Sequence, residues 1–310
     1  MDGKKRRILF IVNPKSGKGL IKNHLLEIID VFVKDRMDVE VYVTQRKMDA
    51  CRVTRRRAQN YDIIVCSGGD GTLDEVVTGM MELPRQQRAP VGYIPAGSTN
   101  DFAGSLGLPA NMKNAAICIT LKQPFRCDVG GFNENYFVYI AAFGAFTDVS
   151  YQTKQEVKNV LGHLAYVLEG AKRLFNLKSY RVKIHIGEEL IEDDFIFGMV
   201  TNSQSVGGFK NITGKNVLLD DGVFEVTLIR RPKNALEIQE ILGAILRQEM
   251  DNKLIYARKA RQVYFESEEE IPWTLDGEFG GIHRTVEVKN YMQAVAIMAN
   301  REMQEEITEE

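Results

Sequence analysis

The sequence is poor in the residues that build metal centres and disulfide frameworks. Its four cysteines form no CxxC pair, and its four histidines lie far apart with no HExxH pattern. These absences argue against a histidine-based metal site and favour reduced thiols in the core of a cytoplasmic protein. The chain also lacks a long apolar run, because the longest, Phe137–Phe146, is about half the length that crosses a bilayer.

The sequence also has no large excess of acidic over basic residues or the reverse. Acidic residues number 42 and basic residues 40, so the net charge of −2 gives no reason to expect nucleic acid as a partner. The basic N-terminus leads directly into an apolar strand at Ile8–Val12 without the apolar region of a signal peptide, and we therefore expect no secretory leader. The length of 310 residues predicts two domains, because one domain takes roughly 100–200 residues.

The most informative segment is the apolar strand Asp62–Cys66 and the turn that follows it, Ser67-Gly68-Gly69-Asp70-Gly71-Thr72. Three glycines in four positions end the strand, and apolar residues then resume at helical spacing from Leu73. Backbone N–H groups and the helix dipole make such a turn an anion site. Asp70 would repel a phosphate unless a cation or a hydroxyl lies between them. The turn matches neither the P-loop nor the dinucleotide fingerprint, and an ordinary tight turn is the alternative.

Strands and helices alternate through residues 1–127. Apolar strands at Ile8–Val12, Val39–Val43, Asp62–Cys66 and Val91–Ile94 predict a doubly wound parallel sheet. Ligands of such sheets bind beyond the carboxyl ends of the strands, where loops 13–19, 68–72 and 95–101 all carry glycine. Each loop alone could be a plain connection or a helix cap, but three at one edge favour a shared ligand.

Short strand-like runs replace this alternation in residues 128–290. They predict a β-sandwich-like or barrel-like second domain, with the active site in the cleft between the two domains. Two helical inserts are expected, at 159–175 and 235–248. The insert at 159–175, with Lys178 after it, either lies on a membrane surface or packs on its own sheet. Segment 291–310 contains the last apolar run and then an acidic tail. The sequence leaves open whether this run returns to pack on the first domain.

Three motifs give the chain a family resemblance. They are Asn13-Pro-Lys-Ser-Gly17, Gly68–Glu75 and Gly97–Phe102, and in order and spacing they resemble NPxSG, GGDGTxNE and GTxNDF of the diacylglycerol, sphingosine and bacterial lipid kinases. Asp74 replaces the family's usual Asn, and Ser98 its usual Thr. The resemblance implies that the following residues surround ATP: Asn13, Pro14, Lys15, Ser16, Gly17, Thr44, Gly68, Gly69, Asp70, Gly71, Thr72, Leu73, Asp74, Glu75, Ser98, Asn100 and Asp101.

Two further Asp-Gly pairs lie in the second domain, and both are typical of hairpin turns. For the first, the resemblance implies a Mg²⁺ site with the Asp221 carboxylate and backbone carbonyls at Leu218 and Val223. The second resembles the family's DGE motif. It implies that Asp276 accepts the proton of a lipid hydroxyl, with Glu278 as the alternative acceptor or an orienting partner. Asp70, with Mg²⁺, would manage the phosphate charge.

The resulting hypothesis is an ATP-dependent lipid kinase similar to a bacterial soluble diacylglycerol kinase. Its product would be phosphatidic acid, and it would contact the inner face of the membrane from the cytoplasm. A homodimer is left open. An NAD kinase-like phosphotransferase is one alternative, because the GGDGT turn alone permits it. A nucleotide-binding regulator without catalysis is the other.

Overall fold

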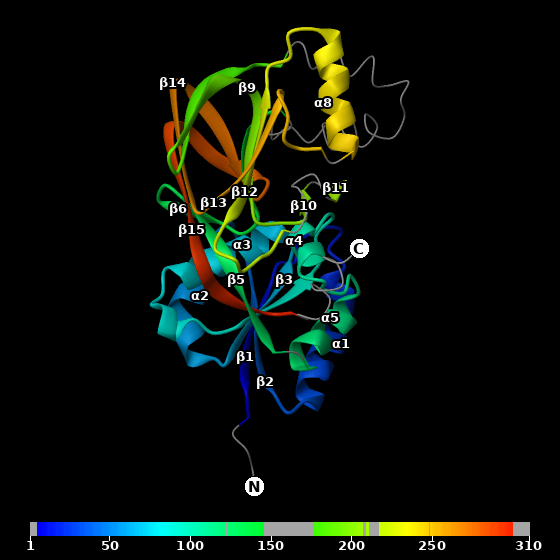
Figure 1. The fold of residues 1–310 in the computed structure, drawn as a ribbon. Helices are drawn as coiled ribbons and strands as arrows, with labels where there is room; N and C mark the ends of the chain where they lie inside the picture. The colour runs from blue at the N-terminus through cyan, green and yellow to red at the C-terminus, as the bar shows by residue number, and fades with distance from the viewer. Residues whose placement is uncertain are drawn as a thin grey trace. The chain divides into compact units, whose positions relative to one another are not determined.

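A computed structural model describes residues 5–121, 123–145, 177–206, 209–210, 217–247 and 249–299. The chain divides into two compact units (Figure 1). Unit 1 comprises Met1–Val129, Leu219–Asp221 and Tyr291–Glu310, and unit 2 comprises Gly130–Leu218 and Gly222–Asn290. The helix expected at 159–175 and the acidic tail lie outside the described residues.

Unit 1 is built on a parallel sheet. Its strands β1 (Arg7–Val12), β2 (Asp38–Val43), β3 (Ile63–Gly68) and β4 (Val91–Pro95) lie in the order β2-β1-β3-β4, and the end of β15 joins β4 through Ile297 and Val91. Five of the six residues of β1 and all six of β3 are buried, as expected for strands covered on both faces. This arrangement confirms the doubly wound α/β fold.

Helices cover this sheet. They are α1 (Ile21–Lys34), α2 (Asp49–Arg57), α3 (Asp70–Met81), α4 (Asp101–Ser105) and α5 (Met112–Leu121), with 3-10 turns η1 (Ala58–Asn60) and η2 (Arg85–Gln87). Helix α1 packs with α5, and α2 packs with α3 (Figure 1). The apolar face of α1, with Ile21, Ile28 and Phe32, belongs to the same core as Phe10 and Val65 of the sheet.

Unit 2 is antiparallel and rich in strands. These are the end of β5 (Pro124–Phe132), β6 (Asn135–Phe137), β7 (Ile140–Gly144), β8 (Tyr180–Ile186), β9 (Glu189–Thr201), β10 (Ser205–Val206), β11 (Phe209–Lys210), β12 (Phe224–Arg230), β13 (Ile255–Ala260), β14 (Gln262–Leu275) and the first part of β15 (Glu278–Met298), with helix α8 (Ala235–Arg247). Strands β9 and β14 each pair with β8 along their first half and with β7 along their second. These four strands therefore form a closed, barrel-like circuit.

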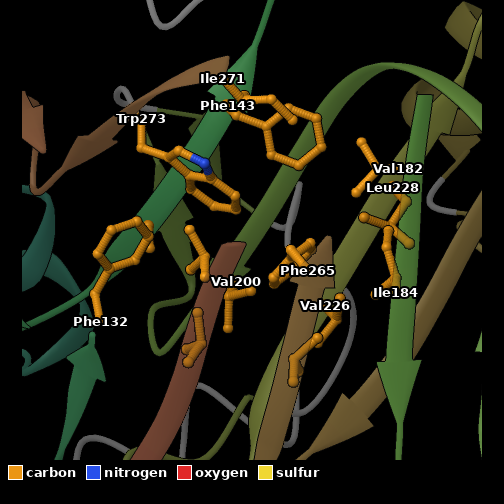
Figure 2. Close-up of a cluster of buried hydrophobic side chains, with 14 of the residues drawn as sticks. Phe132, Phe143, Val182, Ile184, Val200, Val226, Leu228, Phe265, Ile271 and Trp273 are labelled. Atoms are coloured by element: carbon orange, nitrogen blue, oxygen red, sulfur yellow. The ribbon is translucent and has the colours of Figure 1, made fainter. Parts of the chain in front are cut away.

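An aromatic cluster fills the core of unit 2. The only tryptophan, Trp273 of β14, is 1% exposed, and its ring centroid lies 4.8 Å from that of Phe143 and 5.1 Å from those of Phe132 and Phe265 (Figure 2). Because side chains alternate along a strand, burial of Trp273 fixes which face of β14 turns inward near Asp276.

The apolar run Tyr136–Ala142 is divided between two strands, because β6 ends at Phe137 and β7 begins at Ile140. The backbone amides of Val138 and Tyr139 donate to the side chain of Asp276 instead of to a neighbouring strand. Within the residues that the structure describes, no helix combines the length and apolar character that a membrane span requires.

Candidate active site

Three loops of unit 1 meet at the carboxyl ends of β1, β3 and β4. The side-chain amide of Asn13 donates to the hydroxyl of Thr72 over 2.9 Å, which joins the first loop to the second. The backbone nitrogen of Ala96 donates to the carbonyl of Gly68 over 2.7 Å, which joins the third loop to the second. The structure therefore brings together three motifs, at residues 13–17, 68–75 and 97–102, that are well separated along the sequence.

Glycine permits this close approach. A Cβ atom on Gly97 would lie 2.7 Å from the Cα of Gly69, and one on Gly17 would collide with the carbonyl oxygen of Ala96. Gly17 also has a φ of +54°, in the left-handed region. The side chain of Ser16 lies nearby, because a Cβ on Gly69 would be 3.3 Å from its Oγ. A concave backbone of this kind, beside the start of α3, suits phosphate oxygens.

Asp70 links two of the loops. It is the first residue of α3, and its Oδ2 accepts a hydrogen bond from the backbone nitrogen of Asp101 over 3.0 Å. Asp101 is 5% exposed and begins α4. Burial, followed by the charge of Asp70 and that of Asp101, raises the pKa of the nearby Tyr93 hydroxyl well above its usual range. The two carboxylates supply oxygens of the type that Mg²⁺ binds.

Asn100 shapes the third loop. Its backbone is left-handed, with φ of 54°, and its Oδ1 accepts a hydrogen bond from the backbone nitrogen of Gly97 over 2.9 Å. Its Nδ2 donates to the carbonyl of Gly97, and the hydroxyl of Tyr93 lies 3.3 Å from its Oδ1. The side chain therefore holds the turn in place, while Ser98 at the tip is exposed. Tyr93 was not expected at the site.

The end of the GGDGTLDE motif lies within α3. Leu73 is fully buried, and Asp74 is partly buried. The Glu75 carboxylate accepts hydrogen bonds from the backbone nitrogens of Met48, at 2.8 Å, and Ala50, at 3.0 Å. These amides lie at the start of α2, so the contacts of Glu75 connect α3 to α2.

The remaining predicted ATP residues lie around the first loop. The backbone nitrogen of Lys15 donates to Oδ1 of Asn13 over 3.0 Å, and its side chain is exposed. Pro14 is partly exposed between them. Thr44, which follows β2, donates its backbone N–H to the carbonyl of Val12 over 2.9 Å. Thr44 is therefore at the same end of the sheet as the three loops.

In unit 2, Asp276 and Gly277 form the two-residue turn between β14 and β15. Both have positive φ, of 50° and 81°, as a type I′ hairpin requires. The Asp276 side chain is buried, and its carboxylate accepts three backbone hydrogen bonds: from Val138 at 2.6 Å, and from Tyr139 and Ile140 at 3.0 Å each. The Asp276-Gly277 hairpin turn is therefore present, and the Asp276 carboxylate is hydrogen-bonded to the β6–β7 connection.

A second layer of hydrogen bonds supports that connection. The carbonyl of Tyr139 accepts from the hydroxyl of Thr201 over 2.7 Å and from the backbone nitrogen of Asn202 over 2.9 Å. Both residues are fully buried at the end of β9. Thr201 therefore acts on Asp276 through the backbone of Tyr139. Sequence patterns gave no signal for this role, because a buried threonine in a strand is common.

Glu278 lies two residues beyond Asp276, at the first position of β15. Its side chain is exposed, in contrast to the buried Asp276, and it pairs across the hairpin with Leu275. The two carboxylates of the DGE motif therefore have different surroundings: one is enclosed by backbone amides and the other is accessible from solvent.

The expected metal ligands lie around a short segment that is anchored in unit 1. The carbonyl of Leu219 accepts from the backbone nitrogen of Asp128 over 2.7 Å, and the carbonyl of Asp220 from Nε2 of Gln293 over 3.3 Å. The backbone nitrogen of Gln293 in turn donates to the buried Asp128 carboxylate over 2.7 Å. Leu218 is 43% exposed, and Asp221 and Val223 are partly exposed.

This donor set fits a hard cation in its chemistry. Carbonyl and carboxylate oxygens are the ligands that Mg²⁺ accepts, with waters completing the shell. Across the part of the chain that the structure describes, no three His, Cys, Asp or Glu residues gather as a metal cluster. The expected set contains one carboxylate, from Asp221, and so is not a cluster of that kind.

Two family comparisons cover most of the chain. Residues 7–132 match the Diacylglycerol kinase catalytic domain, and residues 142–299 match the YegS C-terminal NAD kinase beta sandwich-like domain. The first match contains all three glycine-bearing loops, and the second contains Asp276 and Glu278.

Relatives that align with most of the chain are also named diacylglycerol kinases. Diacylglycerol kinase of Staphylococcus carnosus (strain TM300) is 33% identical over 280 residues, which are 89% of this chain and 90% of that one. Diacylglycerol kinase of Bacillus subtilis (strain 168) is 32% identical over 279 residues, or 89% and 91% of the two chains.

A solved structure shares the whole fold. A Bacillus anthracis str. Sterne protein, named as a candidate diacylglycerol kinase, has a TM-score of 0.81 at 26% identity over 97% of this chain and 100% of its own.

Proposed function

The chain belongs to the diacylglycerol kinase family and is a lipid kinase, and from that premise we propose that it transfers the γ-phosphoryl group of ATP to the hydroxyl of diacylglycerol, giving phosphatidic acid. The observation that carries the proposal is the meeting of three glycine-bearing loops, joined by the hydrogen bonds from Asn13 to Thr72 and from the Asp101 nitrogen to Asp70. A cradle of backbone amides beside a helix start suits phosphates, and carboxylates within it suit a phosphate that arrives with a cation.

ATP is proposed to lie with its phosphates over residues 68–72. The exposed Lys15 supplies a positive charge and Ser16 a hydroxyl. Gly69 and Gly97 let the second and third loops approach each other closely, because a Cβ on Gly97 would lie 2.7 Å from the Cα of Gly69. The contacts of Glu75 with α2 support a role for it in holding α3, and those of Asn100 support a role in holding the third loop.

Mg²⁺ is the proposed metal. Asp70 and Asp101 would hold it on the phosphates, and Asp221 with the carbonyls of Leu218 and Val223 would hold it in the second expected site. When bound it would neutralise phosphate charge that builds up during transfer. The argument rests on the oxygen chemistry of these groups, all of which are hard ligands.

Glu278 is the proposed proton acceptor, with Asp276 as the residue that holds the turn. Both were candidates from the motif, and the contacts favour this division. Both oxygens of Asp276 already accept backbone hydrogen bonds, whereas the Glu278 side chain is exposed. A general base must reach the proton that it removes, which an accessible carboxylate on a fixed turn can do.

In the proposed reaction the lipid hydroxyl oxygen attacks the γ-phosphorus. The bond from that phosphorus to the bridging oxygen breaks, ADP leaves with the electron pair, and the hydroxyl proton passes to Glu278. Positioning and charge neutralisation supply most of the rate in phosphoryl transfer. The enzyme would act from the cytoplasm on lipid at the inner face of the membrane.

The test is incubation of the protein with Mg²⁺, γ-labelled ATP and a total bacterial lipid extract supplemented with diacylglycerol. Labelled phosphatidic acid is the expected product, and Asp70→Asn should abolish it. A parallel reaction with NAD in place of lipid examines the rival acceptor. Label in NAD and none in any lipid would overturn the proposal.

A further inference from the structure

The hydroxyl of Tyr93 contacts both the second and the third loop of unit 1. Tyr93 is the third residue of β4, pairs with Cys66 of β3 and is fully buried. Its hydroxyl oxygen lies 3.4 Å from the carbonyl oxygen of Gly68 and 3.3 Å from Oδ1 of Asn100. Gly68 ends β3 at the second loop, and Asn100 belongs to the third. One side chain therefore connects the two loops from within the sheet.

Packing alone does not explain a tyrosine at this position. The other residues of β4 are apolar or glycine, and all five residues of the strand are buried. A phenylalanine would fill nearly the same space, whereas a buried hydroxyl lowers stability unless it forms hydrogen bonds. In the part of the chain that the structure describes, the hydrogen-bond partners of this hydroxyl are Gly68 and Asn100. The contribution of the hydroxyl is therefore made through the loops.

The two acceptors compete for one proton. The Gly68 carbonyl already accepts from the backbone nitrogen of Ala96 over 2.7 Å, and Oδ1 of Asn100 accepts from that of Gly97 over 2.9 Å. Each oxygen has a second lone pair, but the hydroxyl has a single proton to donate. Both distances from the hydroxyl exceed the usual O–H···O separation of about 2.7–2.8 Å. The hydroxyl therefore lies between the loops, and a small movement of either loop towards it shortens one hydrogen bond.

The same two acceptors adjoin the carboxylates to which the proposed function assigns Mg²⁺. Asp70 is two residues beyond Gly68, and Asp101 directly follows Asn100. The backbone nitrogen of Asp101 donates to Oδ2 of Asp70 over 3.0 Å. Tyr93 thus contacts the chain on either side of this hydrogen bond. Because its side chain is fully buried, Tyr93 can act on a bound nucleotide only through these neighbours.

We propose that Tyr93 is a positioning residue for phosphoryl transfer, whose hydroxyl sets the separation of the two loops and so the placement of Asp70 and Asp101 around the metal-bound phosphates of ATP. This rests on the proposed function, because it takes ATP and Mg²⁺ to lie at these loops. Hydrogen bonds of an active site often tighten only when the ligand is bound. Removal of the hydroxyl should therefore weaken the metal-dependent part of nucleotide binding.

The test measures nucleotide binding with and without metal. Isothermal titration of the wild type and Tyr93→Phe with ATP, in Mg²⁺ and in EDTA, gives the ratio of the two affinities. Tyr61→Phe is the matched control. Tyr61 is also buried and its hydroxyl also forms hydrogen bonds, with Arg57 and Glu40, but it precedes β3 and so lies at the other end of that strand from Gly68. Thermal unfolding of each variant separates loss of stability from loss of binding.

We expect Tyr93→Phe to lower the affinity for MgATP about threefold to tenfold, as loss of one hydrogen bond implies, and the affinity for metal-free ATP by less. Tyr61→Phe should lower the melting temperature and keep the wild-type ratio of affinities. A Tyr93→Phe protein with the wild-type ratio would overturn the inference, whatever its melting temperature, because a purely structural role would leave that ratio unchanged.

The outcome for Tyr93 is separate from that of the proposed function. If the wild type binds MgATP but transfers no label to lipid, the proposed function fails, and the ratio of affinities still decides the role of Tyr93. If the wild type binds no MgATP, both the proposed function and the role of Tyr93 are overturned.

Discussion

The carboxylate of Asp276 lies 2.6 Å from the backbone nitrogen of Val138, a residue 138 positions earlier in the chain. Two further backbone amides donate to the same carboxylate, so a buried charged group closes the gap between β6 and β7. Charge-assisted hydrogen bonds of this kind are among the stronger ones in proteins. The position of the β14–β15 turn, and with it the position of Glu278, therefore depends on Asp276.

The two carboxylates of this turn should respond differently to amide substitution. Glu278→Gln should lower kcat by about 10²–10⁴-fold with an unchanged melting temperature, because it removes a proton acceptor from an exposed site. Asp276→Asn should lower the melting temperature, since its new NH₂ group would face a backbone N–H donor. The expected loss of stability is about 1.5–3 kcal/mol. Steady-state kinetics and thermal unfolding of both variants measure the contrast.

One result would reverse the roles assigned to Asp276 and Glu278. If Asp276→Asn melts like the wild type but has lost its activity, while Glu278→Gln keeps a normal kcat, the proton acceptor is Asp276. Glu278→Asp, which keeps the carboxylate and shortens the side chain, should retain part of the activity that Glu278→Gln loses.

Thr201 should influence catalysis without touching the substrate. Thr201→Val keeps the shape of the side chain and removes the hydroxyl that donates to Tyr139, whose backbone nitrogen holds Asp276. We expect kcat to fall about tenfold with an unchanged KM for ATP, because the turn is displaced by a fraction of an ångström. Thr201→Ser, which keeps the hydroxyl, should restore the rate. A Thr201→Val enzyme with lower stability but normal kcat would limit the residue to a structural role.

Local patterns predicted the strands and helices of unit 1 well. Apolar runs of five or six residues, glycines in succession and helical spacing after Leu73 are all readable within a short window, and β1, β3 and β4 lie close to where the sequence placed them. The meeting of the three loops followed from a general property of parallel sheets rather than from any single motif.

Other contacts were beyond the reach of local patterns because they join distant segments. The partners of Asp276 lie at residues 138–140, and the contact of Thr201 with Tyr139 spans 62 residues. Nothing in the residues around Leu219 indicated that 219–221 would belong to unit 1, held there by Asp128 and Gln293. The contacts of the Glu75 carboxylate with the backbone nitrogens of Met48 and Ala50 likewise join segments more than twenty residues apart.

The glycine contacts predict a sharp difference between two alanine variants. Gly97→Ala should raise the KM for ATP and lower stability, because the new Cβ would lie 2.7 Å from the Cα of Gly69. Gly104→Ala is the matched control seven residues on, in α4, where a Cβ meets nothing within 4 Å. Alanine there should raise stability by about 0.5–1 kcal/mol through helix propensity. Isothermal titration with ATP and chemical unfolding measure both effects. Equal ATP affinity in the two variants would contradict the close packing of the loops.

Asp49 predicts how the stability of unit 1 depends on pH. Its carboxylate is buried at the start of α2, and the hydrogen bond from Arg52, with those from the backbone nitrogens of Gln45 and Arg46, lowers its pKa from 3.8 to about 2. The folded protein therefore binds this proton more weakly than the unfolded chain. The resulting stabilisation is fully present above pH 3.8 and is lost as the pH falls towards 2.

Asp49→Asn should therefore have a lower urea midpoint than the wild type at pH 7, and the difference should narrow as the pH falls from about 4 to about 2. Asp30→Asn serves as the control, because it removes the same charge from an exposed ion pair with Lys34 and so should shift the midpoint little at any pH. Urea unfolding of the three proteins at several pH values gives the comparison. A constant difference between the wild type and Asp49→Asn over this range would mean that the hydrogen bonds to Asp49 do not distinguish its charged form, and the proposed source of acid sensitivity would be lost.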